Sequence, residues 1–352
     1  MSAHAHAPAR PPARRRLRLP RATLARTLAL VLLGALVLLL ASEGLSSYQN
    51  LQLADGCYYF AVLAGLTVLT GLSGQISLGH GALMAVGAYT VALLVGNEHW
   101  PLVAAIVAAV LVSSAVGVLV GAAGSRLRGP YLAGATLAFA IGLPALAEKY
   151  SSTFGGANGL TIDPPAVPSW LGASFPLERW EAWIAGIGAL VVVFVMNNLV
   201  RSGIGRSFRA VRDDEIAASL CGLHVGRWQT LAFVISAACA GLAGGLLAVV
   251  LQLAAPGSFQ LGLSLSLLTA IALGGLGSQI GAIWGAAVLV LLPGWSEDLA
   301  HSFSLSQKVS ANLPLAIYGV VLIVAMLAWP TGIQGALRRI VAIARRSSAR
   351  GG

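Results

Sequence analysis

Charged residues are scarce in this chain of 352 residues. They make up 10% of it, against about 25% in an ordinary soluble domain, while 57% of the residues are hydrophobic and the mean hydropathy is +0.82. Several uncharged apolar runs approach or exceed the roughly 18–20 residues that cross a bilayer as a helix. Short alternating segments, which are typical of β-barrel spans, are absent. The composition therefore predicts an all-α polytopic membrane protein.

The sequence also lacks motifs for nucleotide binding, metal binding and ion coupling. No G-x-x-x-x-G-K-[ST] sequence occurs, so this chain has no P-loop of its own for ATP. The three cysteines lack paired or metal-ligand spacing, and we interpret them as small core residues. No apolar run carries a carboxylate near its centre; the acids that map near the ends of runs are Glu43, Asp55, Glu98 and Glu148. Ion-driven carriers usually need buried ionisable groups, so this scarcity argues against one, with His80 as the remaining candidate.

Basic residues are concentrated in four clusters. These hold 19 of the 22 Lys and Arg residues and lie at 10–26, 126–128, 201–227 and 338–350. Such segregation is the positive-inside pattern of membrane proteins. It predicts that both termini and the loops near 126 and 201–227 are cytoplasmic. No folded soluble module carries these charges, which argues against nucleic-acid binding.

The apolar runs and the charges together predict ten passages through the membrane. They cover 22–41, 55–72, 79–96, 101–123, 130–147, 182–200, 228–250, 261–275, 279–294 and 312–330. Glycine-rich links at 72–79 and 275–279 are consistent with breaks or re-entrant turns, so the expected number of spans is eight to ten. We predict three parts: a disordered basic tail at 1–21, a transmembrane domain at 22–335 and a second basic tail at 336–352.

The segment 71–89 combines glycines with polar side chains inside an apolar setting. Small residues let helices approach closely in lipid, and polar groups there need partners or a wet cavity. Gln75, Ser77 and His80 either line a translocation pathway or hold helices together, and for Ser77 and His80 we favour the second role. Gly71-x-x-Gly74 has a weak echo in Gly274-x-x-Gly277, which fits either two related halves or chance.

The loop at 201–227 contains a predicted short cytoplasmic helix. Asp213 or Asp214 can cap the segment Asp214–Leu220, and Gly222 can end it. Such a helix suits docking into a groove of a partner subunit. The alternative is an amphipathic loop that lies on anionic lipid.

These residues resemble a known family. Segment 71–89, Gly129–Phe139, Gly155–Leu160, Gly205–Gly222 and Gly274–Ala286 occur in the order found in branched-chain amino-acid ABC transporter permeases of the LivM-like type. The resemblance implies an ABC importer permease fold, a second and commonly different permease, two ATP-binding subunits and a periplasmic solute-binding protein. It implies no cofactor, no metal and no enzymatic activity of its own, since ATP hydrolysis takes place on partner chains.

Site residues follow from the matched blocks. The resemblance implies an ATPase-coupling loop with Arg206, Phe208, Arg209, Arg212, Asp213, Asp214, Glu215 and Gly222. A pathway or helix-packing signature comprises Gly74, Gln75, Ser77, Gly79, His80, Gly87 and Tyr89. An outer loop comprises Gly155, Gly156, Asn158 and Gly159, and it either receives the binding protein or makes a tight turn.

The expected function is import of branched-chain or other small hydrophobic amino acids across the bacterial inner membrane. Two alternatives stay open at this point. Related permeases carry urea, short amides or other small solutes, and the sequence does not separate these from amino acids. A protein of another class, a stand-alone channel or an ion-coupled carrier, would use His80 as a titrating relay.

Overall fold

The structure is a computed structural model that describes residues 21–126, 130–172 and 174–302, together with 317, 319–320, 323–324 and 332–337. Its elements are α1 (Arg21–Gly44), α2 (Ser47–Leu66), η1 (Thr67–Leu72), α3 (His80–Ala92), η2 (Leu93–Asn97), α4 (Leu102–Gly124), α5 (Pro130–Lys149), α6 (Ser151–Phe154), η3 (Gly156–Asn158), β1 (Leu160–Thr161), η4 (Ser169–Leu171), α7 (Leu177–Arg201), α8 (Gly203–Asp213), α9 (Glu215–Leu220), α10 (Val225–Leu251), β2 (Leu253–Ala254), η5 (Pro256–Phe259), α11 (Leu261–Gly274) and α12 (Gln279–Ser302). The tails predicted at 1–21 and 336–352 and the span predicted at 312–330 lie almost wholly outside these residues.

The all-helical prediction is confirmed, since in the described part of the chain the strands amount to one pair of two residues each. Seven described helices are long and apolar enough to cross a membrane, and two shorter apolar helices cover His80–Gly96 and Gln279–Trp295. These nine segments correspond to the first nine predicted passages.

Helix α2 starts earlier than predicted. Its first turn is polar, yet Ser46 and Gln49 form a reciprocal capping box in which each side chain bonds to the other's backbone N–H, an arrangement that stabilises a helix start. Asn50 also donates to the carbonyl of Ser42 at the end of α1. The predicted start at residue 55 is therefore too late for the helix, which begins at Ser47, and Asp55 lies two turns inside it.

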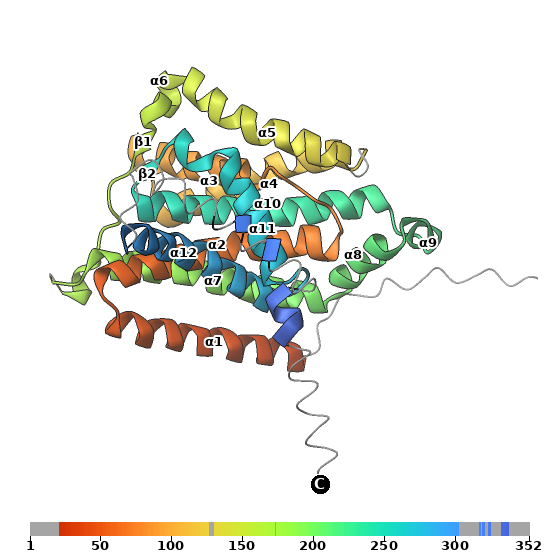
Figure 1. Cartoon of the computed structure of the whole chain (residues 1–352), viewed down its shortest axis with the longest axis horizontal. Coiled ribbons are helices and arrows are strands. Elements are labelled where there is room, and N and C mark those ends of the chain that lie inside the picture. The colour runs from red at the N-terminus through yellow and green to blue at the C-terminus, as the bar shows by residue number, and fades with distance from the viewer. Residues whose placement is uncertain are drawn as a thin grey trace, which may run out of the picture.

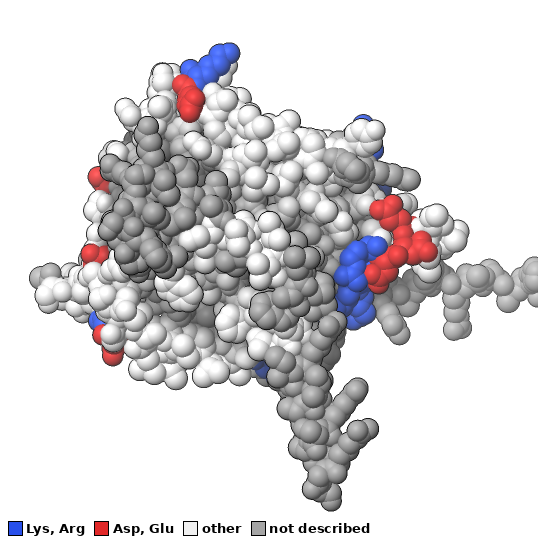
Figure 2. Space-filling model, viewed as in Figure 1, with Lys and Arg blue, Asp and Glu red and all other residues white. Residues whose placement is uncertain are grey.

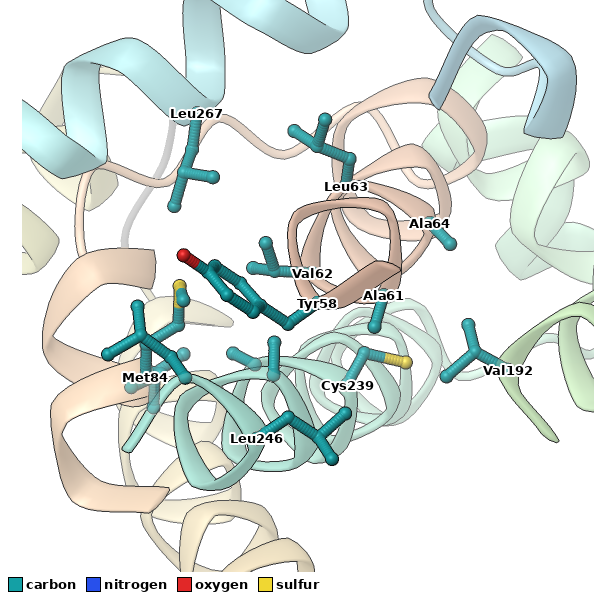
Figure 3. Packing of buried hydrophobic residues seen from close by; sticks show 14 of the residues in the cluster. Tyr58, Ala61, Val62, Leu63, Ala64, Met84, Val192, Cys239, Leu246 and Leu267 are labelled. Carbon is teal, nitrogen blue, oxygen red and sulfur yellow. The ribbon is translucent and has the colours of Figure 1, made fainter. Parts of the chain in front are cut away.

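Helix α10 is the central element, and α2, α3, α4 and α7 all pack against it (Figure 1). Tyr58 and Ala61 of α2 face Leu246 and Cys239 of α10, with Met84 of α3 beside them (Figure 3). Small residues allow these close approaches, as expected for helices packed in lipid.

The crossing of α3 and α10 depends on glycine. A Cβ on Gly87 would lie 2.7 Å from the Cα of Gly241, and a Cβ on Gly244 would lie 2.5 Å from the carbonyl carbon of Met84. On the α4 side, a Cβ on Gly241 would lie 2.7 Å from the carbonyl oxygen of Ala109. Glycines at these positions thus bring three helices into backbone contact.

The charges lie at the two ends of the bundle. Figure 2 shows acidic and basic side chains gathered over α8 and α9 at one end and a few acidic and basic side chains at the opposite end, while the described surface between them is mostly uncharged on this face. β1, β2 and α6 lie at the end opposite α8 and α9 (Figure 1). An uncharged belt between two charged ends is the surface expected of a helical bundle in a bilayer.

Candidate functional site

The first predicted break separates α2 from α3. Helix α2 continues through a π-helical turn, η1, and the backbone is then irregular from Ser73 to Gly79. The N–H of Ser73 donates to the carbonyl of Val68 at 3.0 Å. Gly74 follows with a φ of +75°, a backbone conformation that glycine adopts at low cost. Widened π turns are frequent at functional positions in helices.

Neighbouring helices supply hydrogen bonds to the far side of this break. The hydroxyl of Thr136 in α5 accepts from the N–H of Leu78 at 3.0 Å. The hydroxyl of Ser264 in α11 accepts from the N–H of Gly81 at 2.9 Å. Gly81 lies in the first turn of α3, where N–H groups lack partners within the helix, and Leu78 lies in the irregular backbone just before it. The break is therefore fastened to two other helices through its backbone.

The polar side chains of the break point into the protein. Gln75 is buried and donates to the Ser73 hydroxyl at 3.2 Å, while the hydroxyl of Ser77 accepts from the N–H of Gly79. His80 is 1% exposed, and its Nε2 lies 2.7 Å from the hydroxyl of Ser236 in α10. The structure thus brings these predicted site residues together among packed helices.

The second break, at 275–278, meets the first. A Cβ on Gly71 would lie 2.5 Å from the Cα of Gly277, so the two links are in backbone contact. Gly275 and Gly277 have φ values of +120° and +79°. Gly332, with a φ of +72°, lies against Gly275. The two glycine-rich links, distant in sequence, form one junction.

Helix α9 has the predicted ends. Asp214 accepts from the N–H groups of Ile216 and Ala217 at 2.8 and 3.0 Å. At the other end Gly222 has a φ of +85°, its N–H donates to Ser219, and the N–H of Leu223 donates to the carbonyl of Ala218. These two hydrogen bonds form a Schellman motif, which ends the helix at Leu220.

Helix α8 precedes α9 and was not predicted as a helix. Ser202 caps it by accepting from the N–H of Ile204, and its buried face consists of Gly205, Phe208 and Val211. Phe208 is fully buried and packs edge-on against Trp228 of α10, with ring centroids 5.7 Å apart. The cap followed by apolar residues at helical spacing was a readable signal.

The outward face of the α8–α9 segment is exposed. In α9 the side chains of Ile216 and Leu220 are 74% and 84% exposed, four residues apart on one face. Asp213, Asp214 and Glu215 are also exposed, as is Arg206. Arg209 donates to the carbonyl of Val200. Apolar side chains this exposed beside charges are typical of a surface that a partner covers.

Arg212 connects α8 to the first break. Its Nη1 donates to the carbonyl of Gly71 at 2.7 Å, and its Nε and Nη2 donate to the carboxylate of Asp213 at 2.9 and 2.7 Å. A Cβ on Gly74 would lie 2.8 Å from the Cγ of Arg212. The predicted coupling loop and the predicted signature are therefore in contact.

The outer-loop residues form a tight turn. Gly155, Gly156 and Gly159 have φ values of +76°, +63° and +72°, and Asn158 is exposed. The turn leads into β1, where Leu160 pairs with Ala254 of β2. Tyr89 of the signature lies beneath it and packs edge-on against Phe154, with ring centroids 5.2 Å apart.

A cavity of about 550 Å³ opens at the same end as this turn, between α2, α7, α10 and α12. Asp55, Glu178 and Glu181 line it, and Gln252 donates to Glu181 at 3.1 Å. Glu181 is 1% exposed. The prediction missed this residue because it started the span at 182, whereas α7 begins at Leu177 and includes it.

The arrangement consists of interrupted helices that meet at glycines and of an exposed apolar face on α9. Within the described residues, no three His, Cys, Asp or Glu side chains come together as a metal site.

Comparisons with known proteins agree with this picture. Residues 50–326 match the family described as branched-chain amino acid transport system / permease component. LivM of Salmonella typhimurium, named as a high-affinity branched-chain amino acid transport system permease protein, is 35% identical over 302 residues, which cover 78% of this chain and 69% of the relative. LivH of the same organism is 28% identical over 296 residues, which cover 80% of this chain and 92% of LivH.

A solved structure, PsaBC from Streptococcus pneumoniae in complex with Fab, is similar over 82% of this chain and 94% of that one, with 15% identity and a TM-score of 0.40. The family match and the LivM identity decide the assignment. The chain is a multi-pass membrane protein, a transporter subunit and not an enzyme, and it belongs to the family of branched-chain amino acid transport system permease components.

Proposed function

We propose that this chain is a membrane subunit of an ATP-driven importer that carries branched-chain or other small hydrophobic amino acids across the bacterial inner membrane. A second permease completes the pathway, two ATP-binding subunits supply energy and a periplasmic binding protein delivers the solute. The similarity to both LivM and LivH supports this substrate class and the pairing of two permeases. The observation that carries the proposal is the exposed apolar face of α9 beside exposed charges.

The orientation follows from the charges. We place α8 and α9 in the cytoplasm because the loop that holds them carries five of the clustered arginines, and cytoplasmic loops are rich in Arg and Lys. The turn at Gly155–Gly159 and the acidic cavity then face outward. Ten passages with both termini inside are the arrangement that we propose.

At the inner end, α9 is suited to bind a groove on an ATPase. Ile216 and Leu220 would enter the groove, and Asp213 and Glu215 would pair with basic residues at its rim. Surface ion pairs contribute little individually, so burial of the two apolar side chains supplies most of the binding free energy. At about 25 cal/mol per Å² of apolar surface, such anchors contribute substantially even from a helix of two turns.

At the outer end, we propose that the Gly155–Gly159 turn receives the binding protein and that the acidic cavity is the solute's entry. The three positive-φ glycines and the β1–β2 pairing give the turn a fixed shape, which suits rigid docking. Carboxylates at the entry favour the ammonium group of an amino acid.

For the signature residues we propose a packing role. His80 is enclosed and bonded to Ser236, and Ser77 bonds to the backbone of its own break. A titrating relay would need a route for protons to a histidine that is almost inaccessible to solvent. The geometry thus favours an importer energised by partner chains over an ion-coupled carrier.

The test is reconstitution with the two ATPases, the second permease and the binding protein in liposomes. We expect ATP-dependent uptake of labelled leucine, isoleucine or valine, and none when the ATPases are omitted. Uptake of urea or acetamide in place of these amino acids would reassign the substrate. Solute flux through this chain alone would refute the importer mechanism.

A pair of variants tests the docking surface. Replacing Ile216 and Leu220 with serine should reduce co-purification of the ATPases, because it removes the apolar anchors. Trp170→Ser is the matched control, since Trp170 is equally exposed but lies in the loop at the opposite end. Equal ATPase retention in both variants would contradict docking at α9.

A further inference from the structure

One side chain joins the cytoplasmic segment to the interior of the bundle. The guanidinium of Arg212 is forked between the carbonyl of Gly71 and the carboxylate of Asp213. Gly71 lies in the last turn of the helix formed by α2 and η1, and Asp213 is the residue before the cap of α9. Arg212 therefore contacts both the first helix break and the α8–α9 segment.

The chemistry of the Gly71 end suits a cation. Carbonyls in the last turn of a helix lack partners within it and carry the negative end of the helix dipole. Arginine presents several donors in a planar fork, so it can hold such a carbonyl and a carboxylate at the same time. A lysine ammonium has no such fork.

Glycine at position 74 allows the arginine to lie close to the backbone of the break. A Cβ there would come within 2.8 Å of the Arg212 Cγ, so the aliphatic part of the side chain packs directly on the backbone. The contact is thus both polar and steric. Movement of Arg212 toward the break would press on the backbone at Gly74, and movement away from it would pull on the carbonyl of Gly71.

Two further contacts define what moves together. Phe208 anchors α8 against Trp228 of α10, and Gly71 touches Gly277 of the second break. A shift of α8 would therefore reach the junction of the two breaks, where Gly71 and Gly277 are in contact. Packed junctions of this kind switch between discrete arrangements rather than deforming gradually.

We propose that Arg212 is a positioning residue that fixes the first helix break to the α8–α9 segment, so that nucleotide-driven movement of the ATPases changes the conformation of the break. The inference rests on the proposed function, because it requires ATPases bound at α9. It assigns a role to the contact between the coupling loop and the signature.

The experiment measures the solvent accessibility of the break in the full complex. In a Cys221→Ser background, Ile76→Cys places a thiol in the break at a position that is 53% exposed, while Cys57 and Cys239 are buried. The alkylation rate of this thiol is measured in nanodiscs with and without ATP plus vanadate. Co-purification of the ATPases is recorded for every variant.

In the parent we expect ATP and vanadate to change the alkylation rate by at least about fivefold, the lower end of typical coupling between sites. Arg212→Ala should retain the ATPases but reduce that change to below about twofold, and Arg212→Lys should be intermediate. Arg126→Ala is the control, because it removes an exposed arginine outside the coupling loop and should respond as the parent does.

A parent-like response in Arg212→Ala would overturn the inference. Loss of the ATPases from that variant would overturn it as well, since Arg212 would then be a docking residue. If the parent itself retains no ATPase, the proposed function fails before Arg212 is altered, so the two failures are distinguishable.

Discussion

Replacing Gly244 with alanine puts a methyl group into the crossing of α3 and α10. The new Cβ would lie 2.5 Å from the carbonyl carbon of Met84, whereas ordinary contacts begin at 3.4 Å. The obstacle is backbone, so no side-chain rotation can relieve it. Moving α10 away from α3 is opposed on its other side, where Gly241 is in contact with α4.

The expected cost follows from these constraints. Overpacking a close-packed core costs about 1–3 kcal/mol, and the helices lose contacts along the crossing as they separate. Alanine regains up to about 1 kcal/mol because its helix propensity exceeds that of glycine. Because the methyl group meets backbone that cannot rotate away, the cost lies near the upper value of about 3 kcal/mol. Less the gain of about 1 kcal/mol, we expect Gly244→Ala to lower the free energy of unfolding by about 2 kcal/mol.

The assay is unfolding of the purified chain by increasing SDS in mixed micelles, followed by circular dichroism. Gly56→Ala is the matched control, since Gly56 lies inside α2 and a Cβ there meets nothing within 4 Å. We expect this variant to be as stable as the wild type or more so. Equal stability of Gly244→Ala and Gly56→Ala would refute the view that glycine sets this crossing.

Three other experiments give measurable outcomes. An alanine double-mutant cycle on His80 and Ser236 should yield a coupling energy of about 0.6 kcal/mol, the average for hydrogen bonds between membrane helices. The His80→Ala variant should also leave the pH profile of uptake unchanged, and an altered profile would support a proton relay instead. Asn198→Ala removes the acceptor of the Thr27 hydroxyl and should weaken the attachment of α1 to α7 by about 0.6–1.7 kcal/mol. The same SDS titration measures this loss, and an unchanged midpoint would contradict it. Asp214→Ala removes the cap of α9 at a cost of about 1 kcal/mol, so amide hydrogen exchange in the first turn of α9 should become roughly fivefold faster. Unchanged exchange would mean that packing alone stabilises the helix.

The fold was predictable from the sequence where the signal is local. Long apolar runs locate the helices, and Asp214 and Gly222 mark the ends of α9 because capping depends on residues a few positions away. The start of α2 was predicted too late because hydropathy falls in its first turns, although Ser46 and Gln49 carry a capping box. Helix α8 was overlooked although Ser202, Phe208 and Val211 have helical spacing.

The geometry of the candidate site was less accessible, since its contacts join distant parts of the chain. The hydrogen bond from Arg212 to Gly71 spans 141 residues, and no local pattern pairs them. Burial of Glu181 depends on the packing of α7 against its neighbours. The roles assigned to the coupling loop, the signature and the outer turn stay predictions that the experiments above address.

The meeting of the two glycine-rich links also constrains the order of biogenesis. A ribosome working at about 5–20 residues per second makes Arg212 roughly 7–30 s after Gly71, and Gly277 later still. During that interval Gly71 has no second link to contact, because Gly277 has not yet been made. Arg212 can bind the carbonyl of Gly71 first, and the second link at 275–278 then completes the junction. The helix break is therefore among the last parts of this protein to reach its final environment during synthesis, and a truncated chain that ends before the second link would leave it open.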